Sequence, residues 1–177
     1  VKSGDIVVVN TGNDTILLLD EAGEFKEALL DSSTDPSLIY NALAYDSSLD
    51  QILVAYDSKV ATSDRIIGIS LWDGKVSNVL SNGNLNGVLT GVARLNNGSL
   101  VVLEGTTTME LFDAASVRSG NPFSAAITAN GVDVQPLANG GYVVCSTGTA
   151  NTVRTYSVAG VLSATATSAL PLPTLGA

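Results

Sequence analysis

The chain has 177 residues, of which 45% are hydrophobic and only 14% are charged, and its formal net charge is −9. This length fits one domain with a real core, and this composition excludes a disordered chain. The acidic balance makes a nucleic-acid or anionic-membrane partner unexpected. The sequence contains no histidine and a single cysteine, which excludes histidine-based catalysis, histidine zinc sites and an intrachain disulfide.

Apolar residues occur in short β-branched runs that Gly, Asn, Asp and Ser interrupt. This pattern is typical of many short strands. The best helical candidate is the short segment 24–30. No apolar run reaches the 18 residues that a membrane-spanning helix needs. We therefore expect an all-β chain without a membrane span.

A fourfold internal repeat runs through the sequence. The units begin at Ile6, Ile52, Leu100 and Tyr142, and each reads strand, polar turn, strand, Gly or Asx turn, strand. A further short strand precedes the last three units, beginning at Ala42, Thr90 and Val132. Each unit therefore predicts a four-stranded antiparallel sheet of about 45 residues.

A single sheet of this kind cannot bury both of its faces, whereas sheets stacked radially can. The sequence therefore predicts a β-propeller of about four four-stranded blades, in one domain over residues 1–177. The blades are expected at about 1–38, 39–86, 87–129 and 130–170. A β-sandwich is the alternative, but it gives no reason for a regular period.

The first unit lacks the leading strand of the others. Joined head to tail, the ends of the chain read GAVKSGDIVVVN, which parallels GVARLNNGSLVVLE from Gly91. We therefore expect the tail, residues 171–177, to pair with the first blade and close the ring. Pro171 and Pro173 restrict that pairing to its last part or to a sheet edge. The open alternatives are a ring built from two chains, or a chain that is part of a longer repeat array.

The first unit, GDIVVVNTGNDTILLLDEAGEFKEAL, resembles the NHL and YVTN type of propeller repeat. The likeness rests on Gly4, the turn Asn10-Thr11-Gly12-Asn13, Asp20 and Gly23. It is strong over about half of the chain. The resemblance implies a binding scaffold, and some relatives with this repeat are calcium-dependent lactonases.

Polar residues recur where the second strand of each blade ends, near the expected central channel. They are Asn10, Tyr56, Glu104 and Ser146, and Asp57 follows Tyr56. Converging polar groups at a channel mouth are a default ligand site. We expect Glu104 to form an ion pair with Arg94 on the preceding strand, because a carboxylate after an apolar run needs a partner. The candidate ligand-binding residues are Asn10, Tyr56, Asp57, Arg94, Glu104 and Asp133.

A calcium site is a minority interpretation of the same residues. Asn10, Asp57, Glu104 and Asp133 could offer oxygen ligands from four blades. Two other columns are expected to be structural. Cys145 falls in an apolar column that predicts burial. The residues Leu19, Trp72, Phe112 and Tyr156 form an aromatic-rich column that predicts packing between blades, with an aromatic platform that stacks on a ligand as the alternative.

These features predict an extracellular, periplasmic or cell-surface recognition or adhesion module. It would bind a protein or a glycan through loops on one propeller face. The expected contact loops are Asp57 to Arg65 and Ala114 to Pro122. We predict no enzymatic activity and no cofactor besides calcium, and a homo-oligomer remains open. The alternatives are a calcium-dependent lactonase-like hydrolase with a metal-bound water and a purely structural repeat segment.

Overall fold

The computed structural model describes residues 3–31, 38–58, 64–81, 85, 87–105, 107–118, 130–147 and 151–168. This part of the chain is all-β. The segment expected as a helix, 24–30, is instead extended, because it forms the outer strand of a sheet. The strands are β1 (Ile6–Asn10), β2 (Thr15–Leu19), β3 (Phe25–Asp31), β4 (Leu38–Asp46), β5 (Gln51–Ser58), β6 (Arg65–Ser70), β7 (Val76–Leu80), β8 (Leu89–Arg94), β9 (Leu100–Glu104), β10 (Thr108–Phe112), β11 (Asn130–Pro136), β12 (Tyr142–Thr147), β13 (Asn151–Tyr156) and β14 (Leu162–Ser168).

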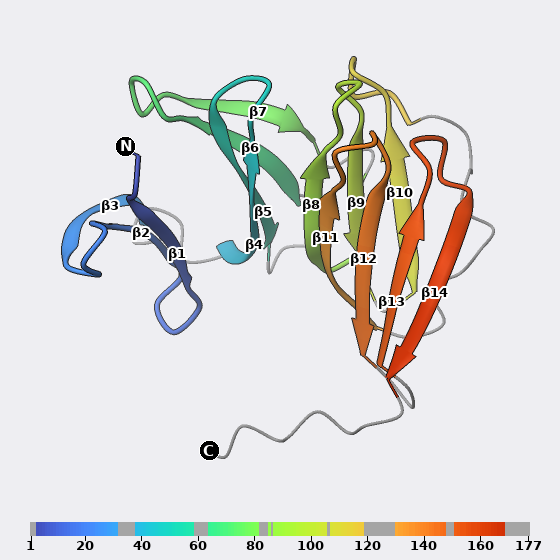
Figure 1. The fold of residues 1–177 in the computed structure, drawn as a ribbon. Coiled ribbons are helices and arrows are strands. Elements are labelled where there is room, and N and C mark those ends of the chain that lie inside the picture. The colour runs from blue at the N-terminus through green and yellow to red at the C-terminus, as the bar shows by residue number, and fades with distance from the viewer. Residues whose placement is uncertain are drawn as a thin grey trace.

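The strands form four antiparallel sheets that follow the predicted repeat (Figure 1). Their orders are β1-β2-β3, β4-β5-β6-β7, β8-β9-β10 and β11-β12-β13-β14. The predicted leading strands are β4, β8 and β11. They lie next to one another, because β4 contacts β8 and β8 contacts β11. Among the described residues, the first sheet has no leading strand.

The same tight turn recurs at one end of the sheets, which we call the tight-turn end. In the β8–β9 turn, Leu95 N–H donates to the Ser99 carbonyl at 2.8 Å and Gly98 N–H donates to the Leu95 carbonyl at 2.9 Å. The fourth position of this turn needs a positive φ, which glycine adopts without strain; Gly98 has φ +86°. Equivalent pairs of bonds close the turns that begin at Asp20, Asp113, Leu137 and Ser157.

The core lies between neighbouring sheets, so the second strands of the two inner sheets, β5 and β9, are buried on both faces. In β9, Leu100 and Val102 pack toward the β4–β7 sheet, whereas Val101 and Leu103 pack toward the β11–β14 sheet. This two-sided burial explains why β5 and β9 read as continuous apolar runs. A third cluster joins Ile16 of the first sheet to the β4–β7 sheet.

A β-bulge recurs in all three leading strands. The pairing register shifts between Tyr40 and Ala42 in β4, between Leu89 and Gly91 in β8, and between Gly131 and Asp133 in β11. A bulge increases the local twist of a strand and redirects its side chains. In β4 it frees the bulged residue, Asn41, to bond to a neighbouring strand, as described below.

The predicted pairing of residues 171–177 with the first sheet lies outside the described residues and stays a prediction, as do the blade limits. No helix in the described part of the chain is long and apolar enough to cross a membrane.

Candidate functional site

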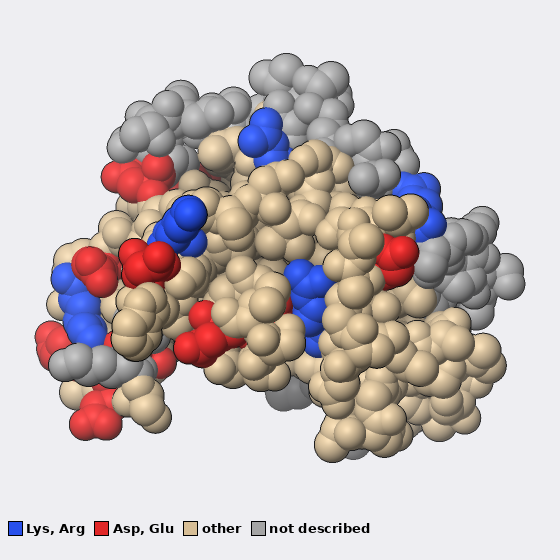
Figure 2. All heavy atoms as spheres, turned by 90° about the horizontal axis from the view of Figure 1, so that it is seen from above, with Lys and Arg blue, Asp and Glu red and all other residues tan. Residues whose placement is uncertain are grey.

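Exposed apolar side chains concentrate at the tight-turn end. Figure 2 looks onto this end of the β8–β10 and β11–β14 sheets and shows a surface with few charges. Acidic side chains gather on the side of the β1–β3 sheet. The exposed large apolar residues at this end are Ile6, Phe25, Tyr45, Leu49, Trp72, Val76, Val117, Val158, Val161 and Leu162.

A hollow of about 700 Å³ opens at the tight-turn end. It lies between the start of β1, the end of β4, the β6–β7 turn and Gln135 of β11. Trp72 and Tyr45 line it and are 92% and 55% exposed. Asp5 and Asp50 supply carboxylates to the same lining. The hollow therefore combines aromatic surfaces with groups that accept hydrogen bonds.

The aromatic residues of this hollow are held by defined contacts. Tyr45 Oη donates to Asp50 Oδ1 at 2.9 Å, and this hydrogen bond is the main reason that the pKa of Tyr45 is raised. Leu71 N–H donates to the Asp50 carbonyl at 3.0 Å, which ties the two neighbouring turns together. Ser70 Oγ accepts from Trp72 N–H at 3.3 Å. A rigid frame of turns thus presents the exposed Trp72 indole.

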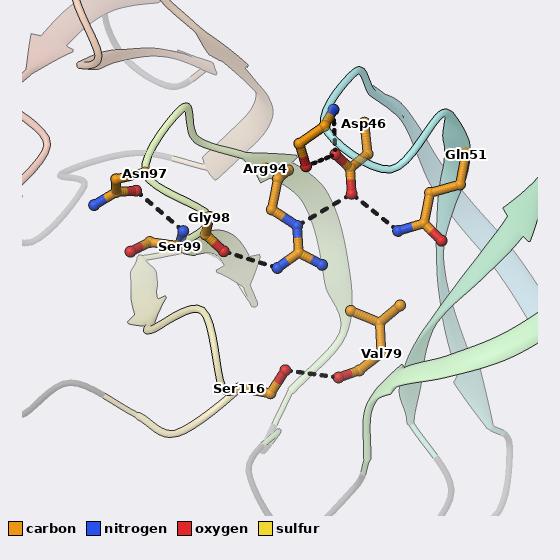
Figure 3. A network of polar contacts seen from close by, with 9 residues as sticks. Asp46, Gln51, Val79, Arg94, Asn97, Gly98, Ser99 and Ser116 are labelled. Atoms are coloured by element: carbon orange, nitrogen blue, oxygen red, sulfur yellow. Dashed lines mark hydrogen bonds and ion pairs between the residues drawn. The ribbon is translucent and has the colours of Figure 1, made fainter.

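Arg94 lies in a buried ion pair between two sheets (Figure 3). Its Nε is 3.2 Å from Asp46 Oδ2, and the two side chains are 8% and 0% exposed. Arg94 Nη1 also donates to the Gly98 carbonyl at 2.8 Å, and Gln51 Nε2 donates to Asp46 Oδ2 at 2.9 Å. Burial alone would raise the pKa of Asp46, but hydrogen bonds from Ser48 and Gln51 and the Arg94 charge hold it below its usual value. Arg94 therefore joins the second and third sheets.

The expected Arg94–Glu104 ion pair is wrong. In the β8–β9 ladder Arg94 faces Leu100, whereas Glu104 faces Leu89 at the other end. Four residues of strand separate these positions by roughly 13 Å. Glu104 is buried where β9 ends, as predicted, but Arg94 belongs to the tight-turn end.

Asp57 forms a second contact between sheets, at the end opposite the tight turns. Its Oδ1 accepts from Leu89 N–H at 2.9 Å, and Oδ2 accepts from Asn41 Nδ2. Leu89 also pairs with Glu104, so the structure brings Asp57 and Glu104 to opposite sides of one strand residue. Burial raises the pKa of Asp57 to about 6, and the nearby Asp64 adds to this, while the two hydrogen bonds oppose it.

This raised pKa predicts that folding stability depends on mild pH changes. The usual Asp value is 3.8, so the folded protein binds more protons than the unfolded chain between pH 4 and 6. The stabilisation is therefore present below about pH 4 and is lost as the pH rises through 6, by on the order of 1–2 kcal/mol. Urea unfolding from pH 4 to 7 measures this loss. We expect Asp57→Asn to abolish it and the exposed Glu27→Gln to retain it; equal slopes in both variants would refute the role of Asp57.

The remaining candidates, Asn10, Tyr56 and Asp133, make local contacts. Asn10 Oδ1 accepts from Gly12 N–H at 3.1 Å within its turn. The Tyr56 ring packs edge-on against Tyr40 at 6.1 Å between centroids. Asp133 is exposed, and its Oδ1 accepts from Val134 N–H at 2.8 Å. No three His, Cys, Asp or Glu side chains within the described ranges lie close enough to hold a metal. The minority calcium interpretation therefore gains no support from Asp57, Glu104 and Asp133.

The predicted aromatic column is wrong at Trp72. The strand partner that corresponds to Leu19, Phe112 and Tyr156 is Ile69, because Ile69 faces Ile52 at the start of the second strand. Trp72 comes three residues later, in the turn after β6. Ile69, Phe112 and Tyr156 are buried as the column predicts. The residue taken for core is therefore the most exposed large apolar side chain of those described.

Two further expectations are corrected. Cys145 is half-buried rather than part of the core. The loops 57–65 and 114–122 belong to opposite ends of the sheets, because the first joins β5 to β6 and the second follows β10 at the tight-turn end. Residues 59–63 and 119–122 lie outside the described residues. These loops therefore do not form a single contact face.

The sequence prediction missed the residues of the hollow, chiefly Tyr45, Asp50, Trp72 and Gln135. One signal was present: Trp72 directly precedes Asp73-Gly74, and Asp-Gly marks a turn. An aromatic residue inside a turn is more exposed than one inside a strand. The other three come together only when separate sheets assemble.

No family model matches the sequence, and no curated protein matches it. Solved structures are similar in fold. One, titled as the nidogen/laminin complex, has a TM-score of 0.70 at 16% identity over 96% of this chain and 64% of that chain. A Bacteroides thetaiotaomicron protein of unknown function has a TM-score of 0.67 at 6% identity over 92% and 40%. The WD40 β-propeller domain of Doa1 has a TM-score of 0.52 at 14% identity over 93% and 65%.

This chain therefore spans less than two thirds of each of these three solved chains. At such identities the similarity shows the fold and not the function. The NHL type in particular is not confirmed. Sheet order, repeat and structural similarity together show that this chain has the β-propeller fold.

Proposed function

We propose that this chain is a recognition module that binds a protein partner through its tight-turn end. The concentration of exposed apolar side chains on rigid turns at that end carries the proposal. Contiguous apolar surface at one end of a scaffold marks an interaction site more often than scattered residues do. Trp and Tyr, which are both exposed here, are enriched among residues that dominate binding energy.

Two observations favour a protein partner over a glycan. The exposed residues extend over several sheets, from Phe25 in the first to Val161 in the fourth, which suits an extended contact. One similar structure, titled as the nidogen/laminin complex, is of an assembly between proteins. We accordingly propose a binding role rather than an enzymatic one.

We also propose an extracellular, periplasmic or cell-surface location, with adhesion as the physiological role. The support is compositional: charged residues make up only 14% of the chain, and the exposed turns are rich in Ser, Thr, Asn and Gly.

The binding surface is tested by changing apolar residues at each end of the sheets. The triple variant Phe25→Ser, Leu49→Ser, Val161→Ser alters exposed residues at the tight-turn end. The control Val88→Ser, Val132→Ser, Val153→Ser alters exposed residues away from that end. We expect the first variant to weaken binding at least about tenfold and the control to retain it. A partner is captured from the source organism, identified by mass spectrometry, purified and titrated by calorimetry.

A control variant that loses binding, while the tight-turn variant retains it, would place the interface elsewhere and contradict the proposal. A glycan array with the same two variants covers the alternative ligand class. A saccharide that binds the intact chain and not the tight-turn variant would replace the protein partner with a glycan.

A further inference from the structure

The hollow between Trp72, Tyr45 and Gln135 has a lining that points to a particular chemical class of ligand. We infer that it receives a cationic side chain, arginine or lysine, from the protein partner. This inference rests on the proposed function, because it assigns one subsite within the proposed tight-turn surface.

The aromatic groups are placed to contact a ligand. Trp72 lines the 700 Å³ hollow and also a second hollow of about 400 Å³ beside β3. Its indole is therefore accessible from both sides and is 92% exposed. Tyr45 lies in the larger hollow and is fixed by its hydrogen bond to Asp50. The face of an indole is the strongest aromatic surface for a cation.

The charge around Trp72 is negative. Asp5 and Asp50 line the larger hollow and Glu27 and Asp73 line the smaller one, and among the described residues neither lining contains a lysine or arginine. Lys26 pairs with Asp5 at 2.8 Å, and Lys75 lies close enough to Asp73 for its charge to act on that carboxylate. Glu27 and Asp50 complete the four. No ion pair to Asp50 occurs among the described residues, so its charge is available to a ligand.

Further carboxylates extend this field over the neighbouring sheet. Glu21 lies close to Gly4 at the rim of the larger hollow, because a Cβ on Gly4 would lie 3.3 Å from a Glu21 carboxylate oxygen. The acidic residues on the tight-turn side of the first sheet are Asp5, Asp20, Glu21, Glu24 and Glu27. Clustered charge of one sign attracts and orients a partner of opposite charge.

Aromatic surfaces also stack on sugars, and sugar hydroxyls can donate to carboxylates, but a neutral saccharide gains no net Coulombic attraction from the negative charge. An arginine gains twice, because its guanidinium can stack on Trp72 while its N–H groups donate to Asp50. Lysine offers the charge without the planar stacking. We therefore expect arginine to bind more tightly than lysine, and both to bind more tightly than glutamine.

The chain contains a single tryptophan, so its fluorescence reports directly on this site. The probes are capped Gly-Arg-Gly, Gly-Lys-Gly, Gly-Gln-Gly and Gly-Glu-Gly peptides, titrated into the intact chain at low salt. We expect the arginine peptide to change Trp72 emission saturably, with a dissociation constant of about 1–10 mM. Raising the salt to about 0.5 M should weaken this binding several-fold.

Matched variants assign the binding to the hollow. Calorimetry is expected to show that Trp72→Ala and Asp50→Asn each weaken binding of the arginine peptide, by about fivefold and threefold. Val132→Ala removes an exposed apolar side chain away from the tight-turn end, and Asp31→Asn removes an exposed carboxylate at the opposite end. Both controls should bind like the unchanged chain.

Three outcomes would overturn the inference. They are equal binding of the glutamine peptide, saturation by a neutral oligosaccharide such as chitotriose but not by the arginine peptide, and no emission change with any peptide. Partner binding that still depends on Phe25, Leu49 and Val161 in these cases would leave the tight-turn surface intact. Failure of the subsite and failure of the proposed function are therefore distinguishable.

Discussion

Replacing Arg94 with alanine is expected to lower the free energy of unfolding by about 3–5 kcal/mol, because removing one partner of a buried ion pair leaves an uncompensated charge. That charge is the Asp46 carboxylate, whose side chain is fully buried. Arg94 joins β8 to the end of β4, so its loss also removes a polar contact between two sheets. Urea unfolding monitored by circular dichroism at pH 7 measures the effect.

A double variant separates the ion pair from simple packing. Arg94→Met with Asp46→Leu removes both charges and keeps comparable volume. We expect it to recover most of the lost stability, because a buried ion pair and an apolar pair of similar size are often nearly equal in free energy. An Arg94→Ala variant as stable as the unchanged chain would show that water solvates Asp46 in solution.

Phe112→Ala is expected to cost about 3–5 kcal/mol, whereas Trp72→Ala should change stability by less than about 0.5 kcal/mol. Phe112 is fully buried between the second and third sheets. Trp72 projects from a turn into solvent. Truncating a buried ring leaves a cavity that its surroundings fill only in part, and truncating an exposed ring leaves none. Thermal and urea unfolding of the two variants measure the difference.

Ile69 gives the matched control, because it occupies in the second sheet the position that Phe112 occupies in the third. Ile69→Ala should cost about 2–5 kcal/mol. If Trp72→Ala lowered the free energy of unfolding strongly and Ile69→Ala lowered it only slightly, Trp72 would be part of the core. That outcome would also remove the exposed indole on which the cation subsite depends.

Local pattern was sufficient for the strands and turns. Most positive-φ positions of the tight turns hold glycine, as at Gly23, Gly98, Gly140 and Gly160, and Ser116 is an exception. Apolar runs mark the doubly buried strands β5 and β9. These signals are reliable because a turn's dihedral angles and a strand's burial depend on neighbouring residues in the chain. The segment 24–30 is the best helical candidate in the sequence, but it forms a strand. A short strand with a half-buried face can show the same spacing of apolar residues as two turns of a helix.

The strand register within single hairpins already contradicts two of the predictions, the Arg94–Glu104 ion pair and the core position of Trp72. The short turn after Arg94 places it opposite Leu100, so the hairpin register already separates Arg94 from Glu104. Trp72 falls in a predicted core column because it precedes the expected turn between the third and fourth strands, as Leu19, Phe112 and Tyr156 do. Counting from the β5–β6 hairpin gives Ile69 instead.

The sequence by itself determined the all-β class, the fourfold repeat and the place of most tight turns, because these follow from interactions within one sheet. Only the tertiary structure decided that Arg94 pairs with Asp46, 48 residues earlier, and that Trp72, Tyr45 and Gln135 line one hollow. Those contacts join different sheets. A repeat period sets how strands pair inside each sheet, but the packing of bulky side chains between sheets sets which polar and aromatic groups meet.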